Sequence, residues 1–345
     1  MRLVGRICFE IFCLSCAAVC GVTPEAELLD VKGIWSRAEH NAYSDLIRFK
    51  DRWYCTFREG RNQFSLDGAI RVLSSFDGEV WLPAALLTSP NDDLRNPKLS
   101  LTPDDRLMIN AVAIRREPGG TIVHSLCWYS TYGRDWTDAV PMCSPGIVLS
   151  RLVWRRQRAY CFGGREGNAS RAALYSSAIG IEFLPIPSEP FPEGNLQDGS
   201  LLFLPDHSIA ALLQVSGSAA RTYFGKSLPP YRAWSWKDLG VRLNSPNMLQ
   251  LPDRRIAVAT GLEGAAPRTL LCWLYPETGR LREFLSLPSG GETGHPGLAF
   301  HGGTLWISYH SSHEGKTRIY LARVKLLEPA AVPQRGGMHT GSYSR

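Results

Sequence analysis

Runs of charge and long apolar segments are both missing from most of this 345-residue sequence. The 38 lysine and arginine residues outnumber the 32 acidic residues, which gives a net charge of +6, but the basic residues are scattered along the chain. Nucleic-acid-binding chains gather their basic residues in patches, so no nucleic-acid partner is expected. The apolar stretch of residues 7–20 is too short to cross a bilayer, which takes ~20 apolar residues, and we expect no membrane span.

Cysteine and histidine clusters with zinc spacing are absent as well. Four of the nine cysteines fall within the first 20 residues, and the other five are Cys55, Cys127, Cys143, Cys161 and Cys272. Five is an odd number, and four of these lie within expected strands. We interpret them as small buried hydrophobes rather than as a disulfide framework. No metal and no cofactor is expected.

The N-terminus has a basic start, an apolar stretch and small residues before Gly21. This pattern is typical of a secretory signal peptide over residues 1–21, and it predicts a secreted or periplasmic protein. A buried helix and a lipid-modified Cys16 or Cys20 are the weaker alternatives. Residues 327–345 have no hydrophobic periodicity and are expected to be disordered, which leaves residues 22–326 for one large domain.

A segment that reads apolar strand, polar turn, apolar strand recurs six times. The copies are residues 45–57, 97–109, 151–161, 199–210, 246–257 and 296–307. Their starts are 52, 54, 48, 47 and 50 residues apart. A period of ~50 residues made of strands is what a propeller blade requires, because one four-stranded blade cannot bury both of its faces alone. The sequence therefore predicts an all-β, six-bladed β-propeller.

A second repeat, Ser-x-x-Gly-x-x-aromatic, follows the third strand of three blades. The copies are residues 75–81, 130–136 and 177–183, and a decayed form covers residues 227–234. Glycine accepts the turn conformation, serine bonds the turn backbone, and the aromatic side chain is buried. These turns resemble the Asp-box, or BNR repeat, of the sialidase (neuraminidase) superfamily. The resemblance supports the same fold, with the boxes on the face opposite to the active site.

Polar residues gather at the starts of the first strands, the ends of the second strands and the starts of the third strands. In a propeller these positions meet on one face around the channel, where a ligand site is expected. Candidate ligand-binding residues in this ring are Asp45, Arg58, Glu59, Arg221, Asn247 and Arg268. The ring also contains His40, Arg95, Asn244, Glu292, His295 and His310.

The resemblance to sialidases extends to individual residues. The stretch Phe57–Arg61, followed by Asp67–Trp81, is similar to the family's first blade, which implies that Asp67 is the general acid/base. Arg221 and Arg268 match two of the three arginines that grip the sialic carboxylate, and a planar guanidinium suits that task. The segments His40–Phe49 and Tyr309–Lys316 more closely resemble a bacterial sialidase-like branch.

Three positions depart from the family pattern. The segment Asn41–Asp45 has no arginine where the family has its first, and His295 stands where the family has its nucleophilic tyrosine. Asp198 aligns with the glutamate partner of that tyrosine. Two alternatives stay open: Asp198 serves as nucleophile on a neutral sugar, or Tyr309 reaches in from the second strand and replaces the tyrosine. The first alternative predicts weak or no cleavage of sialosides.

Three functions fit these observations. The first is a secreted, sialidase-like glycoside hydrolase that cleaves a terminal sugar by acid/base catalysis, with Asp67, Asp198, His295 and Tyr309 as catalytic candidates. Two carboxylates across a channel can perform this reaction. The second is a non-catalytic propeller that binds a glycan or small sugar, and the third is a structural surface protein, because fold alone does not determine function.

Overall fold

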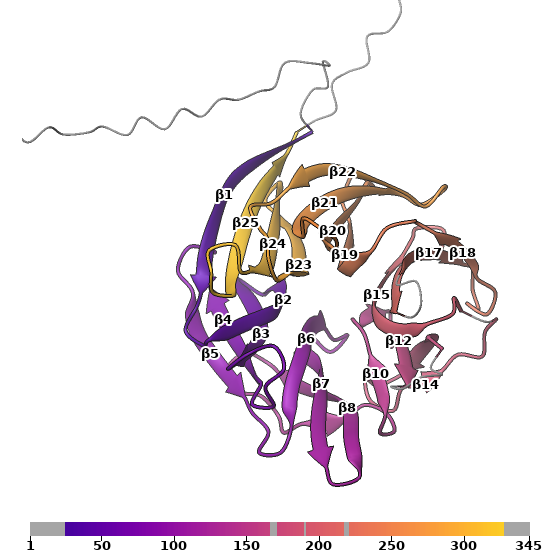
Figure 1. Ribbon diagram of the computed structural model, residues 1–345. Helices are drawn as coiled ribbons and strands as arrows, with labels where there is room; N and C mark the ends of the chain where they lie inside the picture. The colour runs from indigo at the N-terminus through magenta and orange to yellow at the C-terminus, as the bar shows by residue number, and fades with distance from the viewer. Residues whose placement is uncertain (1–24, 166–170, 190, 217–220, 328–345) are drawn as a thin grey trace, which may run out of the picture.

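The computed structural model describes residues 25–165, 171–189, 191–216 and 221–327, which form six antiparallel sheets around a central axis (Figure 1). The predicted six-bladed β-propeller is confirmed, and the described residues contain no helix. The predicted signal peptide lies outside the described residues, as does the tail from residue 328 onward.

The first three blades follow one another along the chain. Blade 1 consists of β2 (His40–Phe49), β3 (Arg52–Gly60), β4 (Ala69–Ser75) and β5 (Leu82–Leu87). Blade 2 consists of β6 (Asp93–Leu101), β7 (Leu107–Glu117), β8 (Gly120–Ser130) and β9 (Val140–Pro141). Blade 3 consists of β10 (Ile147–Leu149), β11 (Val153–Arg155), β12 (Arg158–Arg165), β13 (Ala173–Ser177) and β14 (Leu184–Pro185). Its innermost strand is divided, since β10 and β11 both pair with β12.

The last three blades complete the ring. Blade 4 consists of β15 (Asn195–Phe203), β16 (Ile209–Ser216), β17 (Arg221–Ser227) and β18 (Ser235–Asp238). Blade 5 consists of β19 (Leu243–Gln250), β20 (Ile256–Leu262), β21 (Arg268–Tyr275) and β22 (Arg280–Ser286). Blade 6 consists of β23 (Thr293–His301), β24 (Thr304–Ser311), β25 (Arg318–Leu326) and β1 (Ala26–Trp35). Strand β1 comes from the start of the chain and pairs antiparallel with β25, so the two ends of the propeller close one blade.

The core lies between neighbouring blades. At the boundary of blades 1 and 6, Trp53 of β3 and Trp306 of β24 bring their ring centroids within 4.5 Å. Leu73 of β4 and Ile319 of β25 are fully buried in the same layer. Burying one such side chain stabilises the fold by ~1.5–3 kcal/mol, so each blade is held mainly by its neighbours. The five cysteines of the described residues are free thiols, and all except Cys143 are buried, as predicted.

The three predicted Ser-x-x-Gly turns share one geometry. In blade 1 the hydroxyl of Ser75 accepts a hydrogen bond from the backbone N–H of Gly78 at 2.9 Å, and the equivalent bonds in blades 2 and 3 measure 2.8 and 3.0 Å. Gly78 has a φ of +79°, and a Cβ atom there would lie 2.3 Å from the Trp306 ring of the preceding blade. The glycine is therefore required both by the turn and by the blade boundary.

These turns follow the third strands, whereas Asp67 lies in the β3–β4 connection and Arg221 and Arg268 begin third strands. Because neighbouring strands are antiparallel, the two sets stand at opposite ends of the blades, as predicted. We call the face formed by the starts of the first and third strands the channel mouth.

Candidate ligand site at the channel mouth

A bulge recurs in the innermost strands and shapes the channel mouth. The pairing register shifts between Ala42 and Asp45, Arg95 and Lys98, Asn244 and Asn247, and Gly294 and Gly297. Each bulge holds one non-glycine residue at positive φ, namely Tyr43, Asn96, Ser245 and His295. Bulges re-aim side chains and are frequent beside active sites. A repeated structural device thus presents one side chain from each of four blades.

The side chains of Tyr43, Asn96 and Ser245 meet around His295. Its Nδ1 atom lies 2.8 Å from Ser245 Oγ and 3.1 Å from Asn96 Oδ1, and its ring centroid is 4.6 Å from that of Tyr43. Burial lowers the pKa of His295 well below 6.5, and the nearby Lys98, His310 and Arg151 lower it further. His295 is therefore a neutral imidazole at pH 7 that links blades 1, 2, 5 and 6.

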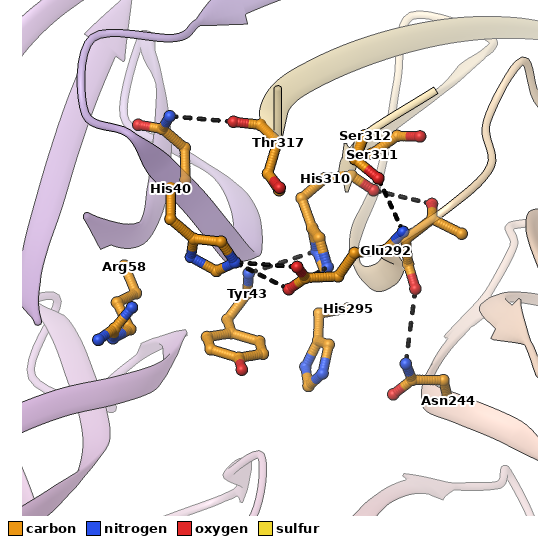
Figure 2. Close-up of polar contacts among 12 residues, drawn as sticks. His40, Tyr43, Arg58, Asn244, Glu292, His295, His310, Ser311, Ser312 and Thr317 are labelled. Atoms are coloured by element: carbon orange, nitrogen blue, oxygen red, sulfur yellow. Dashed lines mark hydrogen bonds and ion pairs between the residues drawn. The ribbon is translucent and has the colours of Figure 1, made fainter. Parts of the chain in front are cut away.

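Glu292 projects into the same region from the residue before β23 (Figure 2). Nε2 of His40 lies 2.9 and 3.0 Å from its two carboxylate oxygens, and Nε2 of His310 lies 4.0 Å from Oε1. The carboxylate side chain keeps 29% of its surface exposed. Burial alone would raise the pKa of Glu292, but the hydrogen bond from His40 and the nearby imidazole of His310 together hold it below 4.5. Glu292 is thus ionised at neutral pH and reachable from solvent.

The backbone fixes the protonation pattern of His310. The N–H of Tyr43 donates to Nδ1 of His310 at 3.3 Å, so the proton of the neutral ring resides on Nε2, which faces Glu292. Burial lowers the pKa of His310 to about 4, although Glu292 acts in the opposite direction. A neutral N–H donor is therefore held beside the carboxylate.

The Ser311–Ser312 pair of the Tyr309–Lys316 segment anchors the loop that carries Glu292. Ser312 Oγ accepts from the N–H of Glu292 at 2.8 Å (Figure 2). Ser311 Oγ accepts from the N–H of Gly290 at 3.0 Å. Gly291 has a φ of +62°, and a Cβ atom there would lie 2.2 Å from Ser312 Oγ. The loop is therefore fitted closely to the end of β24.

Two of the predicted carboxylates, Asp45 and Asp198, form ion pairs within a buried ring of charges below the channel mouth. Arg151 makes a two-point pair with Asp45, at 2.8 and 2.9 Å, and the N–H of Leu99 donates to the same carboxylate at 2.7 Å. Asp198 lies 3.7 Å from the ammonium of Lys98 and accepts from the N–H of Gly199. These groups come from blades 1 to 4 and tie them together. Asp45 and Asp198 are both buried and paired, and their predicted catalytic and ligand-binding roles stay predictions.

Arg58 is fully buried and serves the β3–β4 connection. Its guanidinium donates to Asp93 at 2.9 Å and to the carbonyls of Asn62 and Ser65 at 3.0 and 2.7 Å. The other carboxylate oxygen of Asp93 pairs with Arg95. Our expectation that Arg58 binds a ligand directly needs correction, because its donors are already engaged by the loop that carries Asp67.

Asp67 itself lies on this loop and pairs with Arg61, whose Nε donates to it at 2.8 Å. Burial would raise the pKa of Asp67, but hydrogen bonds from Ser65 and Arg61 lower it to about 2. In this arrangement Asp67 is ionised, whereas a general acid must hold a proton. Its proposed catalytic role stays a prediction that requires a change of partner.

The remaining predicted residues point elsewhere. Glu59 receives Trp35 Nε1 at 2.6 Å and Arg71 at 2.8 Å, on the opposite face of blade 1 from Arg58. Asn247 is buried in the channel wall and donates to the carbonyl of Pro296 at 3.2 Å. Tyr309 is fully buried, with its ring against Tyr320. Its hydroxyl donates to the carbonyl of Pro288 at 2.7 Å, so it does not supply the missing tyrosine of the channel.

Arg221 and Arg268 do not converge on a common partner. Arg221 pairs with Asp238, and Arg268 pairs with Glu283 at 2.9 Å. In each case the partner lies on the fourth strand of the same blade and the pair is partly exposed. The expectation that Arg221 and Arg268 together form a carboxylate clamp therefore needs correction, because each guanidinium is paired with an acid of its own blade.

Sequence reasoning placed Glu292 in the polar ring without making it a catalytic or ligand-binding candidate, and it did not single out Tyr43. The signal for Tyr43 was its spacing, since it stands two residues before Asp45 as His295 stands two before Gly297. Burial raises the pKa of Tyr43, and the charge of Glu292 adds to this shift, so a protonated phenol lies near the ionised carboxylate. Figure 2 shows Tyr43, His40, Glu292 and His295 gathered around one space.

Over the described ranges, no group of three or more histidine, cysteine, aspartate or glutamate side chains is arranged to hold a metal ion. No helix within those ranges is long and apolar enough to cross a membrane.

The comparison with known proteins agrees with this architecture. No family model and no curated protein matches the sequence. A protein of unknown function from Dyadobacter fermentans superposes with a TM-score of 0.77 at 16% identity, covering 88% of this chain and 100% of that one. An α-L-arabinanase from Penicillium chrysogenum, solved with arabinobiose, superposes with a TM-score of 0.67 at 13% identity, covering 87% and 98%.

A Trypanosoma rangeli sialidase mutant with trans-sialidase activity superposes with a TM-score of 0.65 at 10% identity. The match covers 88% of this chain but 60% of the sialidase. The chain has the six-bladed propeller fold that sialidases share with arabinanases. At these identities the likeness establishes the fold, and the chemistry must be argued from the channel mouth.

Proposed function

We propose that this protein is a glycoside hydrolase that removes a terminal, uncharged sugar at the channel mouth. The observation that carries the proposal is Glu292, an ionised and partly exposed carboxylate held by His40 and beside His310. The other channel carboxylates, Asp45, Asp93 and Asp198, are each paired with a buried or half-buried cation. An ionised carboxylate acts as nucleophile or as general base in glycoside cleavage.

The charges around the mouth favour an uncharged sugar. Arg58 and Arg95 are paired with Asp93, and Arg151 is paired with Asp45. A substrate carboxylate would have to compete with these buried acids for a guanidinium and would also lie near the charge of Glu292. The arabinanase with the same fold was solved with arabinobiose, a neutral disaccharide, which supports the same substrate class.

Asp67 remains our candidate for the proton donor. Its pair with Arg61 is exposed on the guanidinium side, and opening such a pair costs no more than about 1 kcal/mol. We propose that a bound sugar displaces Arg61, which would raise the pKa of Asp67 towards the range of an acid. Tyr43 and His295 supply a neutral phenol and a neutral imidazole to orient the sugar hydroxyls.

A second function is favoured by a specific observation. Among the described residues, every carboxyl group whose pKa departs clearly from its ordinary value has it lowered, so none of these nine groups is prepared as an acid. This pattern fits a propeller that binds a glycan at the same mouth without cleaving it. We retain this reading as the alternative.

A panel of chromogenic glycosides, combined with calorimetry of the matching free sugars, separates the two functions. Turnover of at least one neutral glycoside by the purified protein supports the hydrolase. Saturable binding without turnover supports the binding propeller. If a broad panel shows neither turnover nor binding, both functions are rejected. We further propose that the protein is exported, which N-terminal sequencing of the mature chain would test.

A further inference from the structure

The turn after β17 lacks the glycine that the corresponding turns of blades 1, 2, 3 and 5 share. In blades 1, 2 and 5 the turn glycine packs against the preceding blade, and a Cβ atom on Gly78, Gly133 or Gly279 would lie 2.3, 2.1 or 2.4 Å from an aromatic ring there. Blade 4 has residues 227–234 instead, without glycine. Its Tyr231 faces Tyr160 of blade 3, with ring centroids 5.9 Å apart.

A cavity of about 480 Å³ lies beside this altered turn, between blades 3 and 4. Its wall includes Arg155, Arg156 and Arg158 from the β11–β12 hairpin, His207 from the β15–β16 hairpin, and the rings of Tyr160 and Tyr231. These hairpins follow first strands, so the cavity opens at the end of the blades opposite to the channel mouth. Its size falls in the range of about 300–1,000 Å³ found for small-molecule sites.

The charge of the cavity wall is one-sided. None of its residues is acidic, and within the described part of the chain none of the three arginines forms an ion pair with a carboxylate. Arg155 is held in place by Phe203, 4.6 Å from its guanidinium carbon, and by a hydrogen bond from Nη2 to Nδ1 of His207. Its Nη1 atom is buried and has no hydrogen-bond partner. A guanidinium held in place in this way, beside the exposed guanidinium groups of Arg156 and Arg158, suits an oxyanion.

The corresponding cavity beside blade 5 provides the contrast. There Arg254, Arg255 and Arg282 share the wall with three acids, Glu25, Asp253 and Glu277. Arg255 pairs with Asp253 at 2.7 Å, and Arg282 pairs with Glu25 at 2.8 Å. The acid closest in sequence to the blade 3–4 cavity, Asp206, is bonded to Ser208 at 3.0 Å and lies 3.9 Å from Lys226. The blade 3–4 cavity therefore differs from the blade 5 cavity in two respects: its described wall contains no acid, and none of its arginines is paired with a carboxylate.

We propose that the blade 3–4 cavity is a binding site for a small organic oxyanion, with an acidic or phosphorylated sugar as the ligand class. Arg155, Arg156 and Arg158 bind the oxyanion, and the aromatic part of the wall, formed by Tyr160 with Tyr231 edge-on to it, is the surface that a sugar ring packs against. A bare inorganic anion would leave most of the cavity and both rings unused. The site is separate from the channel mouth and does not depend on hydrolysis there.

Calorimetric titration of the full-length protein at low ionic strength tests this inference. The probes are glucose 6-phosphate, glucuronate, inorganic phosphate and, as the neutral control, glucose. We expect at least one anionic sugar to bind more tightly than inorganic phosphate, and any binding of glucose to be unaffected by the double variant described below, because a neutral sugar would bind at the channel mouth instead. The anionic sugar that binds better identifies whether a phosphate or a carboxylate is preferred.

Variants locate the binding. The double variant Arg156→Ala/Arg158→Ala changes two exposed side chains and should weaken the anionic sugar at least tenfold. Arg254→Ala, at the same turn position of blade 5, should leave it unchanged, as should Glu292→Gln in the channel. No binding of either anionic sugar, or equal affinity in the double variant and the wild type, would overturn the site. Equal affinity for inorganic phosphate and glucose 6-phosphate would overturn the sugar part.

Discussion

Nε2 of His310 lies 4.0 Å from Oε1 of Glu292, while Nδ1 of the same ring accepts the backbone N–H of Tyr43. The bulge that presents Tyr43 thus also sets the tautomer of the imidazole beside the carboxylate. Tyr43 belongs to blade 1 and His310 to blade 6, so the packing of these two neighbouring blades determines which nitrogen of His310 carries the proton.

The first prediction concerns pH. His310 has a folded-state pKa of about 4 against 6.5 for an unperturbed imidazole, so the unfolded chain binds its proton first. The stabilising contribution of neutral His310 is complete above pH 6.5 and is lost as pH falls towards 4, by up to about 3 kcal/mol. Urea unfolding at pH 7.5 and pH 5 should show this loss.

His295 has its pKa shifted in the same direction and adds to that loss. Glu292 acts in a lower window, because its lowered pKa gives stability that disappears as pH falls below 4.5. The variant His310→Gln should flatten the decline between pH 7.5 and 5 without abolishing it. An unchanged slope in that variant would show that His310 does not contribute.

The second prediction concerns Arg58. Its replacement by Ala leaves Asp93 buried with one partner fewer and removes the support of the β3–β4 connection. Breaking a buried ion pair in this way costs ~3–5 kcal/mol, which urea unfolding would register. Arg221→Ala, which removes an exposed pair, is the control and should hardly move the midpoint. Similar effects of the two changes would refute the buried role of Arg58.

The third prediction concerns the turn glycines. Gly78→Ala should destabilise the fold by more than about 2 kcal/mol, because it adds a clash with Trp306 to the cost of positive φ. Gly240→Ala is the matched control, since Gly240 has a φ of +67° but nothing within 4 Å of the added Cβ. The difference between the two thermal midpoints measures the packing part alone. No difference would mean that Trp306 yields without cost.

The sequence was sufficient to predict the blades because the strands and turns of each repeat are determined by residues close together in the chain. Apolar alternation, turn glycines and the spacing of the copies all agree on six sheets. The site was less predictable, because side-chain direction at the channel depends on the bulges. A bulge at Ala42–Asp45 brings Tyr43 into the channel, and in the sequence only its spacing before Asp45, which matches that of His295 before Gly297, sets it apart from the buried Tyr309.

Pairing partners from distant blades were also invisible in the sequence. In the sequence, Arg58 resembles a ligand-binding residue, because its partner Asp93 lies 35 positions later and the ion pair forms only in the folded chain. Glu292 stands 252 positions after His40, and the chain must close its ring before the two can meet. The resemblance to sialidases gave the fold correctly, whereas the arginines carried over from it turned out to be paired within their own blades.

The fourth prediction follows from those pairs. On a neutral glycoside that the protein cleaves, Arg221→Ala and Arg268→Ala should each change kcat/KM by less than about twofold. The reason is that each arginine is paired with an acid on the fourth strand of its own blade rather than with a residue of the channel mouth. The wild type should cleave a fluorogenic sialoside weakly or not at all. Robust sialoside turnover by the wild type that is lost in both variants would contradict this prediction and support the hypothesis that Arg221 and Arg268 bind the sialic carboxylate.

The central claim is that the ionised carboxylate of Glu292 takes part in cleavage. Its most direct test compares the wild type, Glu292→Gln and Glu314→Gln on the neutral glycoside with the highest turnover. Glu314 lies in the same blade and is exposed, paired with Arg318 at 3.0 Å, so its variant controls for the loss of one charge. We predict a loss of kcat of at least 100-fold in Glu292→Gln and less than a twofold change in Glu314→Gln, with sugar binding retained in both. Wild-type kcat in Glu292→Gln would contradict the account.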